Sequence, residues 1–142
     1  MNVLGFVGSA RKSGNTSRLV QDVLAGADSE GADTKLYQLS ELSMQGCQGC
    51  LYCREHGNCL IDDDLQPIYD ELRAAEALVI GSPIYIHQLS GQTKLLLDRL
   101  YPLTDQNHKP RFGEKKLVMA YTQAAPLCGY FSGGIGAMSK NH

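Results

Sequence analysis

Residues 3–17 read V-L-G-F-V-G-S-A-R-K-S-G-N-T-S and predict a strand, a loop of small polar residues and the start of a helix. The first six residues form a continuous apolar run, as in a parallel strand that is buried on both faces. A helix is expected over residues 16–27, because apolar residues recur there at helical spacing. A strand that enters a helix through a short loop is typical of a doubly wound α/β sheet.

The loop at residues 9–17 is expected to bind an anion. In this topology, free backbone N–H groups and the positive end of the helix dipole meet at one point. Short donors and one cation are added by Ser9, Arg11, Ser13, Asn15, Thr16 and Ser17. The loop is neither a G-x-G-x-x-G nor a Walker sequence, and it suits a monophosphate held by hydroxyls and amides. The alternative is a helix-capping loop with Ser13 or Asn15 as the cap.

Three further strands and two further helices follow. Residues 34–39 alternate polar and apolar side chains, which predicts a half-exposed strand at a sheet edge. Residues 77–81 and 117–121 are fully apolar and predict interior strands, while helices are expected near residues 65–75 and 91–100. Together these elements predict a flavodoxin-like doubly wound parallel sheet with the strand order 2-1-3-4.

The loops that follow the first, third and fourth strands should meet in one crevice, where open α/β sheets bind ligands. After the third strand, residues 82–86 read S-P-I-Y-I. Ser82 and the backbone amides of Ile84 and Tyr85 are expected to face a planar ring. The fourth strand ends at Thr122 and Gln123.

A second motif lies at residues 46–60, which read G-C-Q-G-C-L-Y-C-R-E-H-G-N-C-L. Its spacing of C-x2-C-x2-C-x5-C is close to the runs that wrap an iron–sulfur cubane, whereas zinc sites usually split their ligands into two separated pairs. Gly46, Gly49 and Gly57 would let the backbone curl around a cluster. The spacing therefore favours a [4Fe–4S] site and leaves zinc, disulfides or free thiols as alternatives. The candidate ligands are Cys47, Cys50, Cys53 and Cys59.

Composition limits the remaining choices. The 142 residues fit one domain, and a net charge of −2 gives no broad basic field for nucleic acid. No apolar run approaches the roughly 20 residues that span a bilayer, and the N-terminus does not resemble a signal peptide. Clustered cysteines in such a chain fit a reducing cytoplasm.

Several charged residues are interpreted as structural. Asp63 and Gln66 resemble a capping box before the helix at 65–75, so a divalent ion on residues 62–64 is the less favoured reading. Asp98 and Arg99 are expected to form an ion pair or a cap. No Ser/His/Asp set or carboxylate pair is evident, and no catalytic residue is assigned.

These motifs together resemble the iron–sulfur flavoproteins, a branch of the NADPH-dependent FMN reductase and flavodoxin-like superfamily. The resemblance covers about residues 1–123, which are expected to form one FMN-binding domain. It is carried by the segments 8–17, 47–59, 62–69, 81–85 and 91–99.

The resemblance implies FMN in the crevice and a [4Fe–4S] cluster on the four cysteines. The residues implied to hold the FMN phosphate are Ser9, Arg11, Asn15, Thr16 and Ser17. Pro83, Ile84 and Tyr85 would lie along the isoalloxazine, and Thr122 would lie near its other edge. The resemblance also implies a homo-oligomer that passes electrons from ferredoxin, or from NAD(P)H as a substrate, to a small-molecule acceptor.

Two other functions fit the same residues: a cluster-free NAD(P)H-dependent FMN or quinone reductase, and a non-enzymatic electron carrier like flavodoxin. The Gly-rich segment 124–142 does not match the family pattern, and no fifth strand or last helix can be read from it. The fourth strand should then leave an apolar edge that favours self-association. Cys128 has no evident role.

Overall fold

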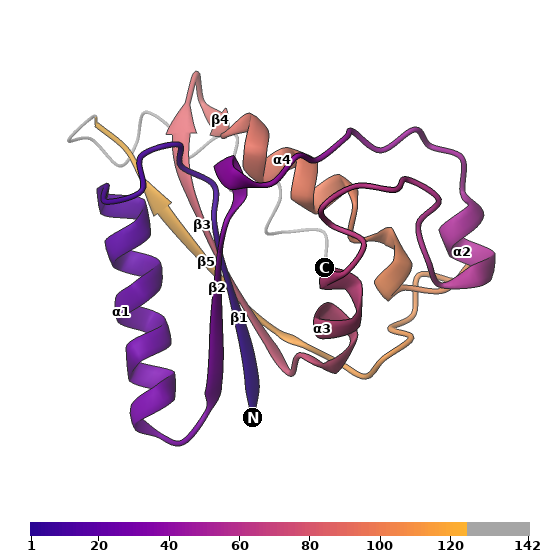
Figure 1. The fold of residues 1–142 in the computed structure, drawn as a ribbon, viewed down its shortest axis with the longest axis horizontal. Coiled ribbons are helices and arrows are strands. Elements are labelled where there is room, and N and C mark those ends of the chain that lie inside the picture. The colour runs from indigo at the N-terminus through magenta and orange to yellow at the C-terminus, as the bar shows by residue number, and fades with distance from the viewer. Residues whose placement is uncertain (125–142) are drawn as a thin grey trace.

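The computed structural model describes residues 1–124, in which four parallel strands form the central sheet (Figure 1). β1 (Asn2–Val7) lies between β2 (Asp33–Gln38) and β3 (Ala77–Tyr85). β5 (Lys116–Thr122) pairs in parallel with the other side of β3. The order β2-β1-β3-β5 confirms the predicted flavodoxin-like topology.

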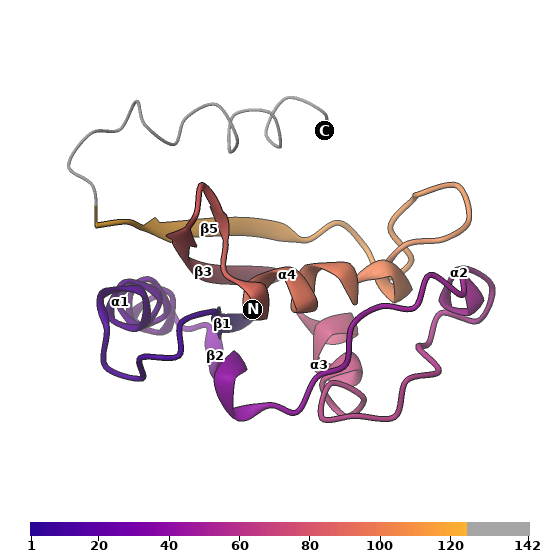
Figure 2. The same ribbon diagram turned by 90° about the horizontal axis from the view of Figure 1, so that it is seen from above.

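Helices cover both faces of this sheet (Figure 2). α1 (Asn15–Ser29) packs on one face, and α3 (Ile68–Ala74) and α4 (Gly91–Asp98) pack on the other. Short turns lie at Leu39–Glu41 and Tyr101–Leu103. Among the helices of residues 1–124, none has both the length and the apolar character needed to cross a bilayer.

β1 connects the two cores because its side chains alternate between the faces of the sheet. Val3 and Val7 pack with the α1 layer, while Leu4 and Phe6 pack with the α3 and α4 layer. All four are buried, which explains the continuous apolar run. Each such side chain contributes about 1.5–3 kcal/mol of burial free energy, so β1 anchors both layers.

β5 differs from the prediction that its residues are buried on both faces. Leu117 is 57% exposed and Val118 is 43% exposed, while Met119 packs against the core and Ala120 is buried. The reason is that no strand among residues 1–124 pairs with the outer side of β5. An apolar run therefore predicts an interior strand only if further chain covers it.

β3 also differs from the prediction, because residues 82–85 continue the strand instead of forming a loop. Tyr85 pairs with Gln88 of the short antiparallel β4 (Gln88–Leu89). The two turn residues, Ile86 and His87, have φ values of 47° and 65°. A two-residue hairpin with both central residues left-handed usually contains Asn or Gly, so Ile86 is strained there, and it is 90% exposed.

The chain leaves β1 through a close contact at Gly8. The Gly8 amide donates to the Gly81 carbonyl at 2.8 Å, and the Ser90 hydroxyl donates to the Gly8 carbonyl at 2.6 Å. A Cβ atom at Gly8 would lie 1.8 Å from the Thr93 hydroxyl oxygen. Only glycine therefore allows the loop after β1 to pass the start of α4.

We expect Gly8→Ala to lower the free energy of unfolding by about 1–3 kcal/mol, because the new methyl group would displace Thr93 or the backbone. Urea denaturation measures the change. Gly26→Ala is the matched control, since no atom lies near its Cβ position within α1 and alanine should stabilise the helix by about 0.5–1 kcal/mol. Unchanged stability of Gly8→Ala would contradict the close packing at this position.

Candidate functional site

A cavity of about 350 Å³ lies at the carboxyl ends of β1, β3 and β5. It is bounded by the loop before α1 and by the β3–β4 hairpin, which both lie at the top of Figure 1. Its lining residues are Ser9, Arg11, Gly14, Asn15, Thr16, Pro83, Ile84, Tyr85, Thr122, Gln123 and Ala124. The three segments predicted to meet therefore do meet, although residues 83–85 belong to β3 and not to a loop.

The start of α1 forms the part of this cavity that was predicted to bind an anion. Its N-cap is Gly14, and no side chain caps the helix, so the alternative with Ser13 or Asn15 as the cap is wrong. A glycine cap leaves the first-turn amides available to a ligand. Arg11 also lines the cavity, and the first turn carries no acidic residue. The charge and the donors at this point suit a phosphate group.

The structure brings eight of the eleven predicted cofactor residues to the cavity wall. Ser13, Ser17 and Ser82 are not among the lining residues. Ser17 is buried and accepts a bond from Gln21, while Ser82 is fully buried and accepts a bond from the Ser90 amide at 3.0 Å. Sequence reasoning did not assign Gly14, Gln123 and Ala124 to the cofactor, although Gln123 lies at the predicted end of the fourth strand.

One hydrogen bond fixes the two sides of the cavity relative to each other. The hydroxyl oxygens of Thr16 and Thr122 lie 2.7 Å apart, although the residues are 106 positions apart in the sequence. This bond joins the first turn of α1 to the end of β5. The loop before α1 and the edge strand therefore form one wall.

A second cavity, of about 290 Å³, is lined by all four clustered cysteines, Cys47, Cys50, Cys53 and Cys59. Cys47 and Cys50 are exposed, and the other two are partly buried. Apolar side chains also line it, including Leu51, Leu60, Ile61 and Tyr101. The loop after β2 thus encloses a thiol-lined space, and Figure 1 places its helix α2 (Tyr52–His56) far from α1.

Two of the three glycines named for this loop have a left-handed backbone conformation. Gly49 and Gly57 have φ values of 66° and 69°. Gly57 ends α2, which begins after Leu51, a non-glycine residue with a φ of 60°. The left-handed residues let the chain reverse direction around the cavity.

The four thiols influence one another. Burial raises the pKa of Cys53, and the neighbouring thiols of Cys59, Cys47 and Cys50 raise it further, since adjacent thiolates repel. Bound cations would relieve this repulsion. Within residues 1–124, no three His, Cys, Asp or Glu side chains converge closely enough to hold a single metal ion.

Sequence reasoning missed the residues that support the cysteine cavity from outside. Arg54 of α2 is buried, donates to Thr104 at 2.9 Å and to the Asp105 carbonyl at 2.7 Å, and its guanidinium lies 4.5 Å from the centre of the Tyr101 ring. It also lies 3.0 Å from Nδ1 of His108, which lines the cavity with Tyr101. These contacts link segments about 50 residues apart, which no local pattern reveals.

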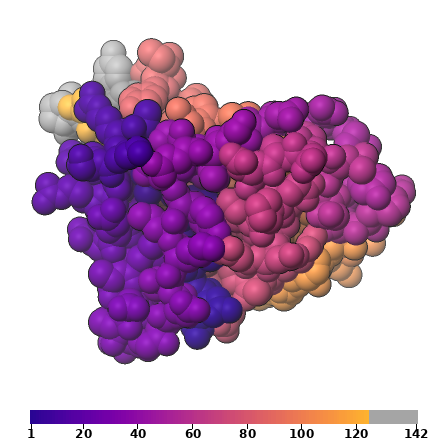
Figure 3. All heavy atoms as spheres, viewed as in Figure 1, coloured from indigo at the N-terminus to yellow at the C-terminus, as the bar shows by residue number. Residues whose placement is uncertain are grey.

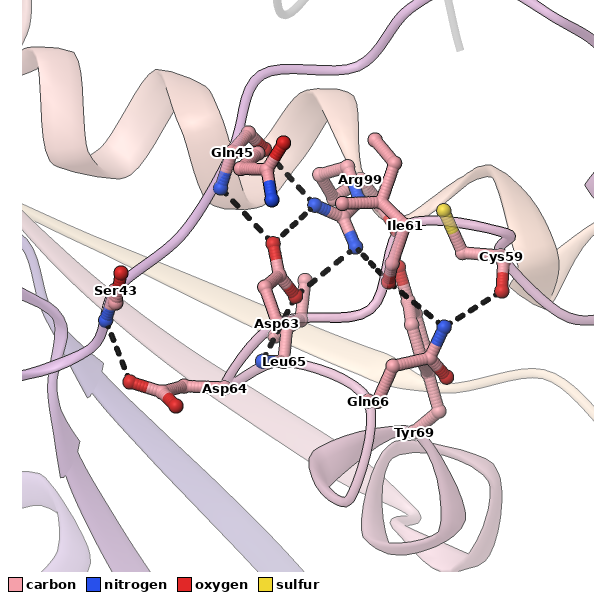
Figure 4. Close-up of polar contacts among 10 residues, drawn as sticks. All are labelled: Ser43, Gln45, Cys59, Ile61, Asp63, Asp64, Leu65, Gln66, Tyr69 and Arg99. Carbon is pink, nitrogen blue, oxygen red and sulfur yellow. Dashed lines mark hydrogen bonds and ion pairs between the residues drawn. The ribbon is translucent and has the colours of Figure 1, made fainter.

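Asp63 and Arg99 form an ion pair beside this cavity (Figure 4). Arg99 donates to the two carboxylate oxygens of Asp63 at 2.7 and 3.2 Å, and the side chains are only 1% and 3% exposed. The predicted capping box is therefore wrong. Asp63 is occupied by Arg99, Gln66 donates to carbonyls of the cysteine loop, and α3 begins after Pro67. The expected ion pair of Arg99 exists, but Asp98 pairs with Lys94.

The environment of Asp63 favours its charged form. Burial by itself would raise the pKa of the carboxyl, but hydrogen bonds from Arg99 and from the amides of Gln45 and Leu65 outweigh it and lower the pKa. The same carboxylate increases the pKa of Arg99, although burial opposes it. The pair is thus fully ionised at neutral pH.

Comparison with known proteins shows which family the chain resembles. Residues 1–129 match the family described as NADPH-dependent FMN reductase. An iron–sulfur flavoprotein of Methanocaldococcus jannaschii is 39% identical over 103 residues, which are 72% of this chain and 53% of that protein. One of Methanosarcina thermophila is 33% identical over 107 residues, covering 75% and 56%. The chain spans about half the length of these relatives.

Solved structures show the same fold. The NAD(P)H:quinone oxidoreductase from Methanothermobacter marburgensis matches with a TM-score of 0.77 at 15% identity, over 99% of this chain and 75% of that one. The enzyme RosB, solved with 8-demethyl-8-formylriboflavin-5′-phosphate bound, matches with a TM-score of 0.72 at 16% identity, over 96% and 57%.

The lowered pKa of Asp63 leads to a prediction about acid stability. Folding depresses this pKa, so the pair stabilises the protein above the unfolded value of about 4, and this contribution is lost as pH falls through the folded pKa. Asp63→Asn leaves Arg99 buried without its counter-charge and should cost about 3–5 kcal/mol near pH 7. We expect the difference in free energy of unfolding between Asp63→Asn and wild type to become smaller below about pH 4.

Urea denaturation at several pH values measures this difference. Glu71→Gln is the control, because its carboxyl pKa is also lowered but its side chain is 35% exposed and pairs with the exposed Lys35. Its effect should be smaller than that of Asp63→Asn. A difference for Asp63→Asn that stays constant from pH 7 to pH 3 would contradict the assignment.

Proposed function

Because this chain belongs to the NADPH-dependent FMN reductase family, we propose that it is a redox flavoprotein with FMN in the cavity at the carboxyl ends of β1, β3 and β5. We further propose an iron–sulfur cluster on the cysteine loop. The observation that carries the proposal is that one cavity is lined by most of the predicted phosphate-binding residues, and a separate cavity is lined by all four thiols.

The residues around the first cavity suit FMN. Asn15, Thr16 and the first amides of α1 would hold the phosphate, with Arg11 supplying positive charge. Pro83, Ile84 and Tyr85 form a wall of the kind that a planar ring requires. We propose that this wall orients the isoalloxazine and excludes water from one side of it.

The residues around the second cavity suit a [4Fe–4S] cluster better than a single ion. A zinc site needs four ligands that converge on one point, whereas a cubane is held by four thiolates at its separate irons. Four cysteines around one cavity fit the second arrangement. The relatives named iron–sulfur flavoproteins support this choice.

Flavin exchanges one or two electrons and a cluster exchanges one, so the pair would link one-electron and two-electron partners. We propose a donor such as ferredoxin or NAD(P)H and a small-molecule acceptor, in the cytoplasm. A cluster-free NAD(P)H-dependent reductase is the alternative, and turnover with NAD(P)H and a quinone by iron-free protein would favour it. Transfer only between redox proteins would favour a carrier.

We propose two sets of variants, each of which should disrupt only one of the two sites. Cys50→Ala should abolish iron binding and leave FMN binding intact, since Cys50 lines only the thiol cavity. Asn15→Leu with Thr16→Val should weaken FMN about tenfold or more through lost phosphate hydrogen bonds, and should leave iron unchanged. Visible spectra with iron and flavin assays of anaerobically purified protein measure both.

Each arm has a matched control. Cys128→Ala removes the fifth cysteine, which lies outside the described residues, and should retain iron. Ser13→Ala removes a loop hydroxyl that does not line the cavity and should change FMN affinity little. Wild-type iron content in Cys50→Ala would refute the cluster site, and unchanged FMN affinity in the double variant would refute the phosphate loop.

We also propose a homo-oligomer. The two cavities share no lining residue, and the exposed apolar side chains Leu117, Val118 and Tyr121 lie together on β5. An exposed apolar strand edge is a site of association. A symmetric assembly would repeat any contact between one chain's flavin cavity and the cysteine cavity of another.

Sedimentation at micromolar concentration tests the assembly. We expect a species heavier than the 15.5 kDa chain, and we expect Leu117→Lys to weaken it. Leu36→Lys is the control, because Leu36 is an exposed leucine on the opposite edge strand, β2. A wild-type protein that sediments as a stable monomer would rule out this proposal.

A further inference from the structure

Both ends of the cysteine loop are held by one buried side chain. Arg99 donates to the Gln45 carbonyl at 2.8 Å and approaches the Ile61 carbonyl at 3.5 Å (Figure 4). Gln45 lies two residues before Cys47, and Ile61 lies two residues after Cys59. Arg99 therefore fixes the distance between the points at which the loop begins and ends.

Gln66 adds a contact to a cysteine itself. Its side-chain amide donates to the carbonyl of Cys59 at 2.6 Å and to that of Ile61 at 2.8 Å. Both bonds come from the segment just before α3, outside the cysteine loop. They orient the backbone at Cys59, and with it the direction of the thiol.

Arg99 is itself held in place by neighbouring protein groups. Asp63 binds Arg99 through both carboxylate oxygens and accepts the Gln45 amide at 2.9 Å. The buried Tyr69 hydroxyl donates to the Arg99 carbonyl at 2.9 Å. Figure 4 shows these groups between α3, α4 and the loop. The ends of the loop are therefore held by contacts within the protein.

Arg99 also carries charge toward the cysteines. Its Nε–H group is buried and has no acceptor among the described residues. The same guanidinium is bonded to the backbone at both ends of the cysteine loop. A buried charge with a spare donor beside a ligand loop is a means of tuning a cluster.

We propose that Arg99, Asp63 and Gln66 are positioning residues for the cysteine site, which hold Cys47 and Cys59 in the binding arrangement before iron arrives and set the charge beside the cluster. This inference rests on the cluster of the proposed function. Outer groups of this kind typically change metal retention by about 10–100-fold.

The first test measures iron retention. Asp63→Leu with Arg99→Met removes the ion pair without leaving a buried charge unpaired, and Gln66→Met removes only the amide donors. We expect both proteins to keep FMN and to lose iron to a chelator about tenfold faster or more than wild type. The matched control is Lys94→Met with Asp98→Leu, because this ion pair lies exposed on α4, directly before Arg99. The control protein should retain iron normally.

The second test measures the reduction potential of the cluster, which a merely structural role would not shift in a signed way. Asp63→Asn leaves the Arg99 cation uncompensated and should raise the potential. Arg99→Gln leaves the Asp63 carboxylate and should lower it. If either protein fails to fold, the double variant, which removes both charges, should lie closer to wild type in potential than the folded single variant does.

The third test uses iron-free protein, so that it does not depend on the cluster. Wild type should protect the Gln45 amide from hydrogen exchange, and Asp63→Leu with Arg99→Met should not. If the Gln45 amide is protected in a wild-type protein that never takes up iron, the proposed cluster is wrong, whereas the preformed loop is supported. Equal exchange in both proteins, or iron loss at the wild-type rate in the folded double variant, would overturn the inference.

Discussion

The buried ion pair of Asp63 and Arg99 holds the cysteine loop, which lies outside the sheet. The sheet and its helices are stabilised by apolar burial on both faces of β1. The cysteine loop buries little, since Cys47, Cys50 and Leu51 are all exposed. Its shape therefore depends on polar anchors, and a bidentate pair satisfied by backbone groups offsets the cost of burying two charges. In Figure 3 the cysteine loop lies on the side of the molecule away from α1.

The fold could be predicted because its signals are local and agree with one another. The apolar run at β1, the alternation at β2 and the helical spacing in α1 each mark an element, and the connection rules for parallel sheets then fix the strand order. The same rules place the loops after β1, β3 and β5 together. Eight predicted cofactor residues consequently line one cavity, although Thr16 and Thr122 are far apart in sequence.

The errors arose where a local pattern competed with a distant partner. Asp63 and Gln66 have the spacing of a capping box, but Arg99 lies 36 positions from Asp63 and bonds it in the fold. Ser82 lies in a predicted ligand loop, yet Ser90 and the close passage of Gly8 bury it. The hairpin at Ile86 was missed because it lacks the Asn or Gly that usually signals a tight turn.

The topology also separates the two candidate sites. The phosphate loop follows β1 and leads to α1 on one face, whereas the cysteine loop follows β2 and leads to α3 on the other. The side chains that hold the thiol loop, Gln66 and Arg99, lie just before α3 and just after α4, not at the cavity beside α1. A cluster held in this way would have its position fixed by the opposite layer of the sheet. A contact between this cluster and a flavin would therefore depend on exposed surfaces of the protein. These include the β5 edge and the cysteine loop.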